Sequence, residues 1–297
     1  MAVDKGRIRE VLRGTWHGIC SHDYMGLASE VAFDFAFSLF PCLLFLAGLL
    51  SVIGISPETF NGMLSLMGNS VPLQIKEIVA DNVFHLIQMD SKGILTAGLL
   101  GTLWAASSAI SATMNALNLA YGVKETRPFW RRRVLSIVLV VGVGIVLLIS
   151  FNVLMFGVRT LQGLERLLQL NSTFSTTVSV VRWPVVFVSV TLVVSFIYHI
   201  APNLRQEWWR VFPGSIFFGF LWVLLTRAFG FYVDHFGYYN RIHGVLGVII
   251  ILLLWLYMTS FILLVGGQLN SELWRVPVDQ KREASEDPLR AMEEIPR

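Results

Sequence analysis

The chain has 297 residues, of which 55% are hydrophobic and only 14% are charged, and its formal net charge is +3. Soluble domains carry about 25% charged residues, so this composition excludes an ordinary soluble protein and indicates an integral membrane protein. The mean hydropathy of +0.64 agrees. The basic residues lie between apolar runs, as orientation signals do, so the positive charge does not indicate a nucleic-acid partner.

Residues 1–30 form a basic segment before the first long apolar run. Between residues 7 and 19, Arg9 and Arg13 lie away from a helical face that carries Ile8, Val11, Leu12, Thr15 and Ile19. A basic amphipathic helix of this kind suits an anionic inner leaflet, so we predict the lipid bilayer as its partner. No unbroken apolar run occurs in this segment, and we expect no cleavable signal peptide.

Six apolar segments are long enough to cross a bilayer, which takes about 20 residues of helix. They predict an all-α integral membrane fold, a six-transmembrane helical bundle within residues 31–273, with spans at 31–55, 93–121, 134–158, 178–200, 211–233 and 244–269.

The loop between the first two spans is the longest in the chain. Residues 57–92 carry two short apolar faces at helical spacing, one before and one after Pro72. They predict two extracytoplasmic amphipathic helices, which either cap the bundle or cover a substrate path. At the other end of the chain, residues 274–297 mix acidic and basic residues and predict a disordered, charged cytoplasmic tail.

Lys and Arg residues set the orientation of a membrane protein, because cytoplasmic segments carry an excess of them. With six spans, the N-terminus, loops 122–133 and 201–210, and the tail lie on one side and hold 16 of the 23 basic residues. The opposite side holds five, and Arg182 and Arg227 lie within spans. The sequence therefore predicts that both termini are cytoplasmic.

Ionisable and polar residues within spans are the best functional candidates in a membrane protein. At 1.5 Å per residue, Glu30 and Asp34 lie near the cytoplasmic start of span one, and spans two, four and six bring polar residues to the same level. The candidate residues of this vestibule or substrate path are Glu30, Asp34, Ser38, Ser107, Ser111, Asn115, Asn118, His199, Gln268 and Asn270.

Two like charges four residues apart repel, so Glu30 and Asp34 should have a basic partner or share a proton. We expect at least one of them within hydrogen-bond reach of Asn115, Asn118, His199, Arg205 or the arginines at 131–133. Further along span one, Pro41 removes a backbone donor near the carbonyl of Phe37, and is a candidate hinge whose freed group Ser38 or water could satisfy.

Span two carries Ser107, Ser111, Asn115 and Asn118 on one helical face. Two interpretations stay open: interhelical hydrogen bonding with close packing, or the lining of a hydrophilic cavity. Arg182 and Arg227 lie deeper, on the outer side. They either reach the outer surface or form structural pairs, or they belong to an anionic substrate path.

Several stretches resemble the YihY/virulence factor BrkB family of bacterial inner-membrane proteins: "FSLFPCLLFL" (37–46), "ETRPFW" (125–130), "APN" (201–203) and "GVLGVIIILLLWLYMTSFILLVGGQLNSEL" (244–273). The resemblance implies a multi-pass protein of the bacterial plasma (inner) membrane whose biochemical role is unsettled. The chain departs from the family pattern at His243, where the family usually has Tyr, and at Gln268, where it usually has Glu.

Members of this family have carried a ribonuclease BN label, but the residues argue against that activity. The six histidines are scattered, Cys20 and Cys42 are isolated, and neither metal-ligand spacing nor a nucleophile–base pair is visible. We therefore predict that the protein is not an enzyme and that it needs neither a cofactor nor a metal.

Two functions fit the sequence. The first is transport or permeation of an unidentified small solute, ion or lipid through the cytoplasm-facing polar vestibule. The second is a non-catalytic envelope scaffold or partner-binding membrane protein, which the amphipathic N-terminal segment and the charged tail favour. The spans do not determine the oligomeric state.

Overall fold

The computed structural model describes residues 5–53, 91–168, 173–235 and 238–274. Over these residues the chain is helical and contains no strand, which confirms the all-α fold. The helices are α1 (Lys5–Ser21), α2 (Tyr24–Ile53), α5 (Ser91–Ala120), α6 (Phe129–Leu168), α7 (Thr173–Ile200), α8 (Trp208–His235) and α9 (Tyr238–Trp274).

Within the described residues, four helical segments are long and apolar enough to cross a membrane: Tyr24–Leu46, Leu95–Ala120, Trp208–Tyr232 and Ile249–Trp274. The predicted spans 134–158 and 178–200 fall within α6 and α7, and α7 also contains a shorter apolar stretch, Pro184–Ile200. The six-span count and the cytoplasmic location of the termini stay predictions. The tail from residue 275 and nearly all of the predicted 57–92 helices lie outside the described residues.

The helices carry many large apolar side chains on their surface. Phe33, Phe40 and Trp104 are each at least 65% exposed. By contrast, Ala28, Ser107 and other small or polar residues are fully buried. In water this distribution would expose a large hydrophobic area, whereas in a bilayer it places apolar side chains against lipid and small residues between helices. The fold is that of a membrane protein.

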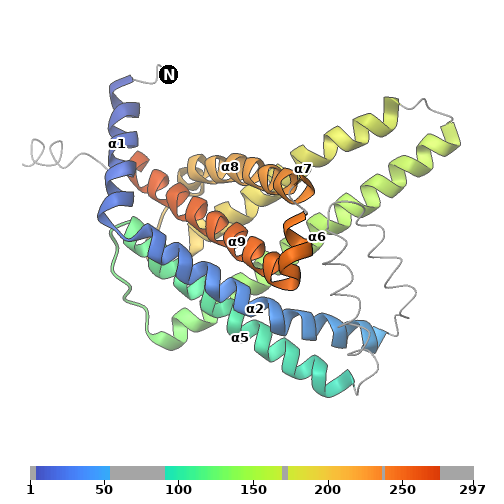
Figure 1. Ribbon diagram of the computed structural model, residues 1–297. Coiled ribbons are helices and arrows are strands. Elements are labelled where there is room, and N and C mark those ends of the chain that lie inside the picture. The colour runs from blue at the N-terminus through green and yellow to red at the C-terminus, as the bar shows by residue number, and fades with distance from the viewer. Residues whose placement is uncertain (1–4, 54–90, 169–172, 236–237, 275–297) are drawn as a thin grey trace, which may run out of the picture.

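The helices approach closely at glycines. Figure 1 shows α2 and α5 lying side by side, and a Cβ atom on Gly98 of α5 would overlap the backbone of Phe45 in α2. Likewise, a Cβ atom on Gly214 of α8 would overlap the carbonyl oxygen of Gly266 in α9. Only glycine permits these crossings, because any other side chain would push the two backbones apart.

One end of the bundle brings together two of the connections between helices, residues 121–128 and 201–207, with the start of α2 and the last turns of α9. We call it the basic end, because the arginines that begin α6 lie there. Helix α1 packs on α9 at this end (Figure 1), with Gly14 facing Glu272 and Gly18 facing Gln268.

Candidate functional site

A cavity of about 190 Å³ opens at the basic end between α2, α5 and the first turn of α6. Glu30 and Asp34 reach it from α2, because a spacing of four residues puts them on one helical face. We call it the charged cavity; it is lined by Glu30, Asp34, Ser108, Ser111, Ala112, Asn115, Phe129, Arg132 and Arg133. It thus combines two carboxylates, two guanidinium groups and three neutral polar side chains.

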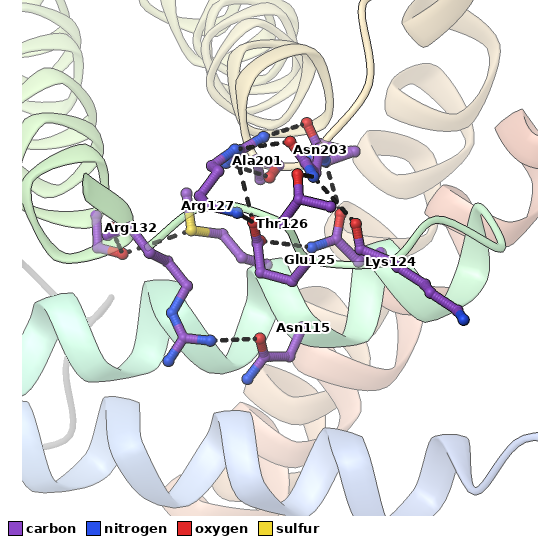
Figure 2. A network of polar contacts seen from close by, with 12 residues as sticks. Asn115, Lys124, Glu125, Thr126, Arg127, Arg132, Ala201 and Asn203 are labelled. Atoms are coloured by element: carbon purple, nitrogen blue, oxygen red, sulfur yellow. Dashed lines mark hydrogen bonds and ion pairs between the residues drawn. The ribbon is translucent and has the colours of Figure 1, made fainter. Parts of the chain in front are cut away.

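Both arginines of the charged cavity are held by α5. Arg132 donates from Nη1 to Asn115 Oδ1 at 3.0 Å (Figure 2). Arg133 donates to the hydroxyl of Ser108 at 3.1 Å and to the carbonyl of Trp104 at 2.9 Å, and its guanidinium lies 4.0 Å from the centroid of the Trp104 ring. These bonds fix where the positive charges stand, which favours a site that is organised before a ligand arrives.

The two carboxylates are less constrained than expected. Glu30 is exposed and Asp34 half-buried. No hydrogen bond or ion pair within the described residues joins either of them to the arginines, Asn115, Asn118 or His199. Burial, followed by the charge of Arg132, lowers the pKa of Arg133, whereas Asp34 raises it. Asp34 and Arg133 line the same cavity, but among the described residues the expected direct contact is absent.

A second polar cluster joins the two connections of the basic end (Figure 2). Arg127 donates to the carbonyls of Ala201 and Pro202 at 3.2 and 2.7 Å and to the Asn203 side chain at 3.1 Å. A guanidinium can bond several acceptors at once, because its N–H donors are arranged in a rigid planar fork.

Asn118 completes this cluster. It donates to Glu125 at 2.8 Å and accepts the backbone N–H of Asn203 at 2.7 Å. Asn203 in turn donates to the hydroxyl of Thr126 at 2.8 Å and the carbonyl of Lys124 at 3.0 Å. We call Asn118, Glu125, Arg127 and Asn203 the loop clamp. Sequence reasoning assigned no role to Glu125, Arg127 or Asn203, although the "ETRPFW" and "APN" stretches that contain them were visible as family motifs.

Gln268 and Asn270 of α9 are buried and bonded to neighbouring helices. Gln268 accepts the hydroxyl of Tyr24 at 2.5 Å and donates to Glu272 at 3.0 Å. Asn270 accepts the backbone N–H of Gly214 at 2.6 Å and donates to the carbonyl of Val211 at 3.0 Å. We call Gln268 and Asn270, with these partners, the α9 seam. Both amides lie outside the charged cavity and hold helices together.

Of three further vestibule candidates, Ser111 lines the charged cavity, whereas Ser107 and His199 do not. Ser107 is fully buried and donates to the carbonyl of Trp104 in its own helix. Ser111 lies 2.8 Å from the hydroxyl of Ser136 in α6 and also lines the charged cavity, so neither interpretation of the α5 stripe is excluded for this residue. His199 stacks on Trp208 with ring centroids 3.9 Å apart and does not line the charged cavity.

Helix α2 runs without interruption through Pro41, which stays a candidate hinge. Ser38 donates to the carbonyl of Phe35 at 2.7 Å, so its proton does not go to Phe37. Arg227 is exposed on α8 and does not line the charged cavity. Arg182 belongs to α7, and its side chain is not described. Among the described residues, no three His, Cys, Asp or Glu side chains come together to hold a metal.

Comparison with known proteins agrees with this architecture. Residues 15–290 match the family described as virulence factor BrkB. A ribonuclease-like protein of Bacillus subtilis, YfkH, is 28% identical over 252 residues, which cover 85% of this chain and 90% of YfkH.

Two further relatives are named UPF0761 membrane proteins. The one from Pseudoalteromonas atlantica is 27% identical over 82% of this chain and 79% of its own length. The one from Ralstonia nicotianae, RSc1559, is 24% identical over 83% of this chain, which spans only 55% of that protein. No solved structure matches the chain significantly. With its apolar helices and a family match across most of its length, the chain belongs to the virulence factor BrkB family of membrane proteins.

Proposed function

We propose that the protein moves a small polar solute through the membrane and that the charged cavity is the vestibule at which the solute enters. The observation that carries this proposal is the set of four charged side chains, Glu30, Asp34, Arg132 and Arg133, around one cavity without a direct ion pair across it. Charged residues in membrane segments are costly, and where they line a water-filled cavity they mark substrate or ion paths.

The cavity suits a small solute that carries both charges. Its volume of about 190 Å³ is below the usual range for drug-sized ligands, so only a few non-hydrogen atoms fit. A cationic group of the solute would meet Glu30 and Asp34 on α2, and an anionic group would meet Arg132 and Arg133 on α6. In this proposal the basic end faces the cytoplasm, the protein is a multi-pass protein of the bacterial inner membrane, and it performs no enzymatic reaction.

A scaffold role is the second candidate. It is favoured by the loop clamp and the α9 seam. In both, polar residues bond to other helices and connections and do not line the charged cavity. An envelope scaffold needs this rigidity and needs no solute path. The two functions differ in what they require of the charged cavity: transport requires that its charged residues contact water and solute, whereas a scaffold does not.

The test is uptake into liposomes that contain the purified protein, with a panel of zwitterionic metabolites, organic anions and inorganic ions. We expect uptake of at least one zwitterion, its loss in the double variant Glu30→Gln and Asp34→Asn, and its retention in Glu10→Gln. Glu10 is an exposed acid on α1 that does not line the charged cavity, so it controls for charge loss. Uptake no higher than in empty liposomes for the whole panel would favour the scaffold.

A second measurement tests access to water. In a variant without Cys20 and Cys42, we expect Glu30→Cys and Asp34→Cys to react with a membrane-impermeant thiol reagent. Complete protection of both positions would overturn the proposed vestibule, even in a protein that folds normally.

A further inference from the structure

A second cavity, of about 500 Å³, lies at the basic end beside α6. It shares no lining residue with the charged cavity. Its walls come from the start of α6 and from the two connections that the loop clamp joins, and they include Thr126, Arg131, Val134, Leu135, Val138 and Asn203. We call it the α6 groove and propose that it binds one anionic phospholipid of the adjacent leaflet.

The α6 groove changes from polar to apolar along the helix axis. Arg131, Val134, Leu135 and Val138 follow one another at the spacing of a single helical face. Val138 lies seven residues beyond Arg131, or about 10 Å further along the helix. The side chains at the level of the loops can bond a headgroup, and those below offer only apolar contact. A phospholipid shows the same change along the membrane normal, from a polar headgroup to apolar acyl chains.

The apolar wall is open to the surroundings of the protein. Val134 and Val138 are each 54% exposed, whereas Leu135 packs against the core of the bundle. In a bilayer these exposed residues face hydrocarbon, so an acyl chain reaches them without displacing water. This excludes a soluble anion such as free phosphate as the fitting occupant, since it would leave the apolar half of the groove unfilled.

Arg131 supplies the charge for the headgroup. The guanidinium of Arg127, the other arginine of the groove, already bonds two carbonyls and Asn203 and lies 3.8 Å from a Glu125 oxygen. The Arg131 guanidinium makes no hydrogen bond within the described residues; it lies 5.4 Å from the centroid of the exposed Trp130 ring. The net charge at this end of the groove is therefore positive, which selects an anionic headgroup.

Two neutral groups stand beside this charge. Asn203 donates to Thr126 Oγ1 at 2.8 Å, so the Thr126 oxygen acts as an acceptor there and its own hydrogen can be donated to a phosphate oxygen. The loop clamp holds both residues in place. A phosphate at this level would meet one guanidinium and one hydroxyl, both at the depth where lipid headgroups lie.

The test is native mass spectrometry of the intact protein in detergent, with phosphatidylglycerol and phosphatidylethanolamine added in equal amounts. We expect a bound phosphatidylglycerol in the wild-type protein. The variant Arg131→Gln should bind it about fivefold less, since one arginine near a headgroup contributes an effect of this size. Arg205→Gln removes the same charge from an exposed position at the same end but outside the groove, and should bind like the wild type.

A third variant, Val138→Trp, fills the apolar half of the groove and should lower binding while leaving Arg131 in place. Equal losses in Arg131→Gln and Arg205→Gln would overturn the proposal, as would equal binding of both lipids by the wild type. Displacement of the lipid by millimolar inorganic phosphate would assign the site to a soluble anion instead. A lipid-free dimer that Val138→Trp dissociates would assign the groove to a second copy of the chain.

Discussion

The charged cavity and the α9 seam lie at the same end of the bundle but use polar residues in different ways. In the seam, Gln268 and Asn270 are buried and each bonds to two partners. In the cavity, Glu30 and Asp34 have no direct partner within the described residues. Buried neutral amides thus bond across the seam, whereas Glu30 and Asp34 line an open cavity without a direct partner there.

This difference has a physical basis. A buried amide with all its partners costs little, because each hydrogen bond to water is replaced by one within the protein. A carboxylate buried without a partner would cost far more, so it is retained only where water or a charged ligand can solvate it. The comparison predicts that changes in the seam affect folding and that changes in the cavity affect transport.

The largest expected effect on stability is that of Asn270→Leu. It leaves the N–H of Gly214 without its side-chain acceptor and removes one of the two side-chain donors to the carbonyl of Val211, both in a buried site, which should lower the free energy of unfolding by about 3 kcal/mol. Thermal unfolding in detergent measures it. Asn115→Leu, at an exposed amide of the charged cavity, is the matched control and should change stability much less. Equal losses would remove the distinction between the two regions.

Arg127→Lys should have the next largest effect, because a lysine ammonium lacks the rigid planar fork with which the guanidinium bonds the two carbonyls and Asn203. We expect a loss of about 2 kcal/mol from the loop clamp, with at least one carbonyl left unpaired. Arg131→Lys keeps the same chemistry outside the clamp and should unfold at the wild-type temperature. If both variants unfold at the same temperature, the loop clamp does not hold the two connections together.

Tyr24→Phe removes one hydrogen bond from the α9 seam, the one to Gln268. It should cost about 1 kcal/mol. A double-mutant cycle with Gln268→Leu isolates this bond, and the coupling between the two positions should be of the same size. Additive effects in the cycle would show that the hydroxyl and the amide do not stabilise each other.

The double variant Glu30→Gln and Asp34→Asn should have the smallest effect on stability and the largest on solute uptake. Neither carboxylate holds a helix in place, so the unfolding temperature should stay at the wild-type value. A marked drop in that temperature, with no change in uptake, would mean that the charged cavity is structural like the seam. Parallel measurements on one preparation separate the two outcomes.

The sequence was sufficient to predict the helices that the structure describes and to place Glu30 and Asp34 on one helical face. The amphipathic helix at 7–19 falls within α1, and all six apolar segments fall largely within helices. The i, i+4 spacing of Glu30 and Asp34 correctly placed them on one face, and both share a cavity with Asn115 and the arginines at the start of α6. Length, periodicity and rise per residue carry this information.

The sequence was not sufficient to predict which residues at one level meet. Depth follows from counting along a helix, but the direction in which a side chain points depends on how the helix is rotated against its neighbours. Asn115 and Asn118 share the α5 stripe, yet one bonds Arg132 at the charged cavity and the other bonds Glu125 in the loop clamp. Gln268 and Asn270 lie at the predicted level but between other helices, so their role in packing became visible only in three dimensions.

The contact of α1 with α9 has a consequence for the order in which the protein can be assembled. Gly14 and Gly18 lie against Glu272 and Gln268, so α1 packs on a helix that is synthesised more than 200 residues later. Until α9 is in place, α1 lacks the helix on which it packs, and the hydroxyl of Tyr24 lacks its acceptor Gln268. A chain that terminates before α9 therefore leaves this face of α1 uncovered, and the arrival of α9 becomes the event that closes this side of the fold.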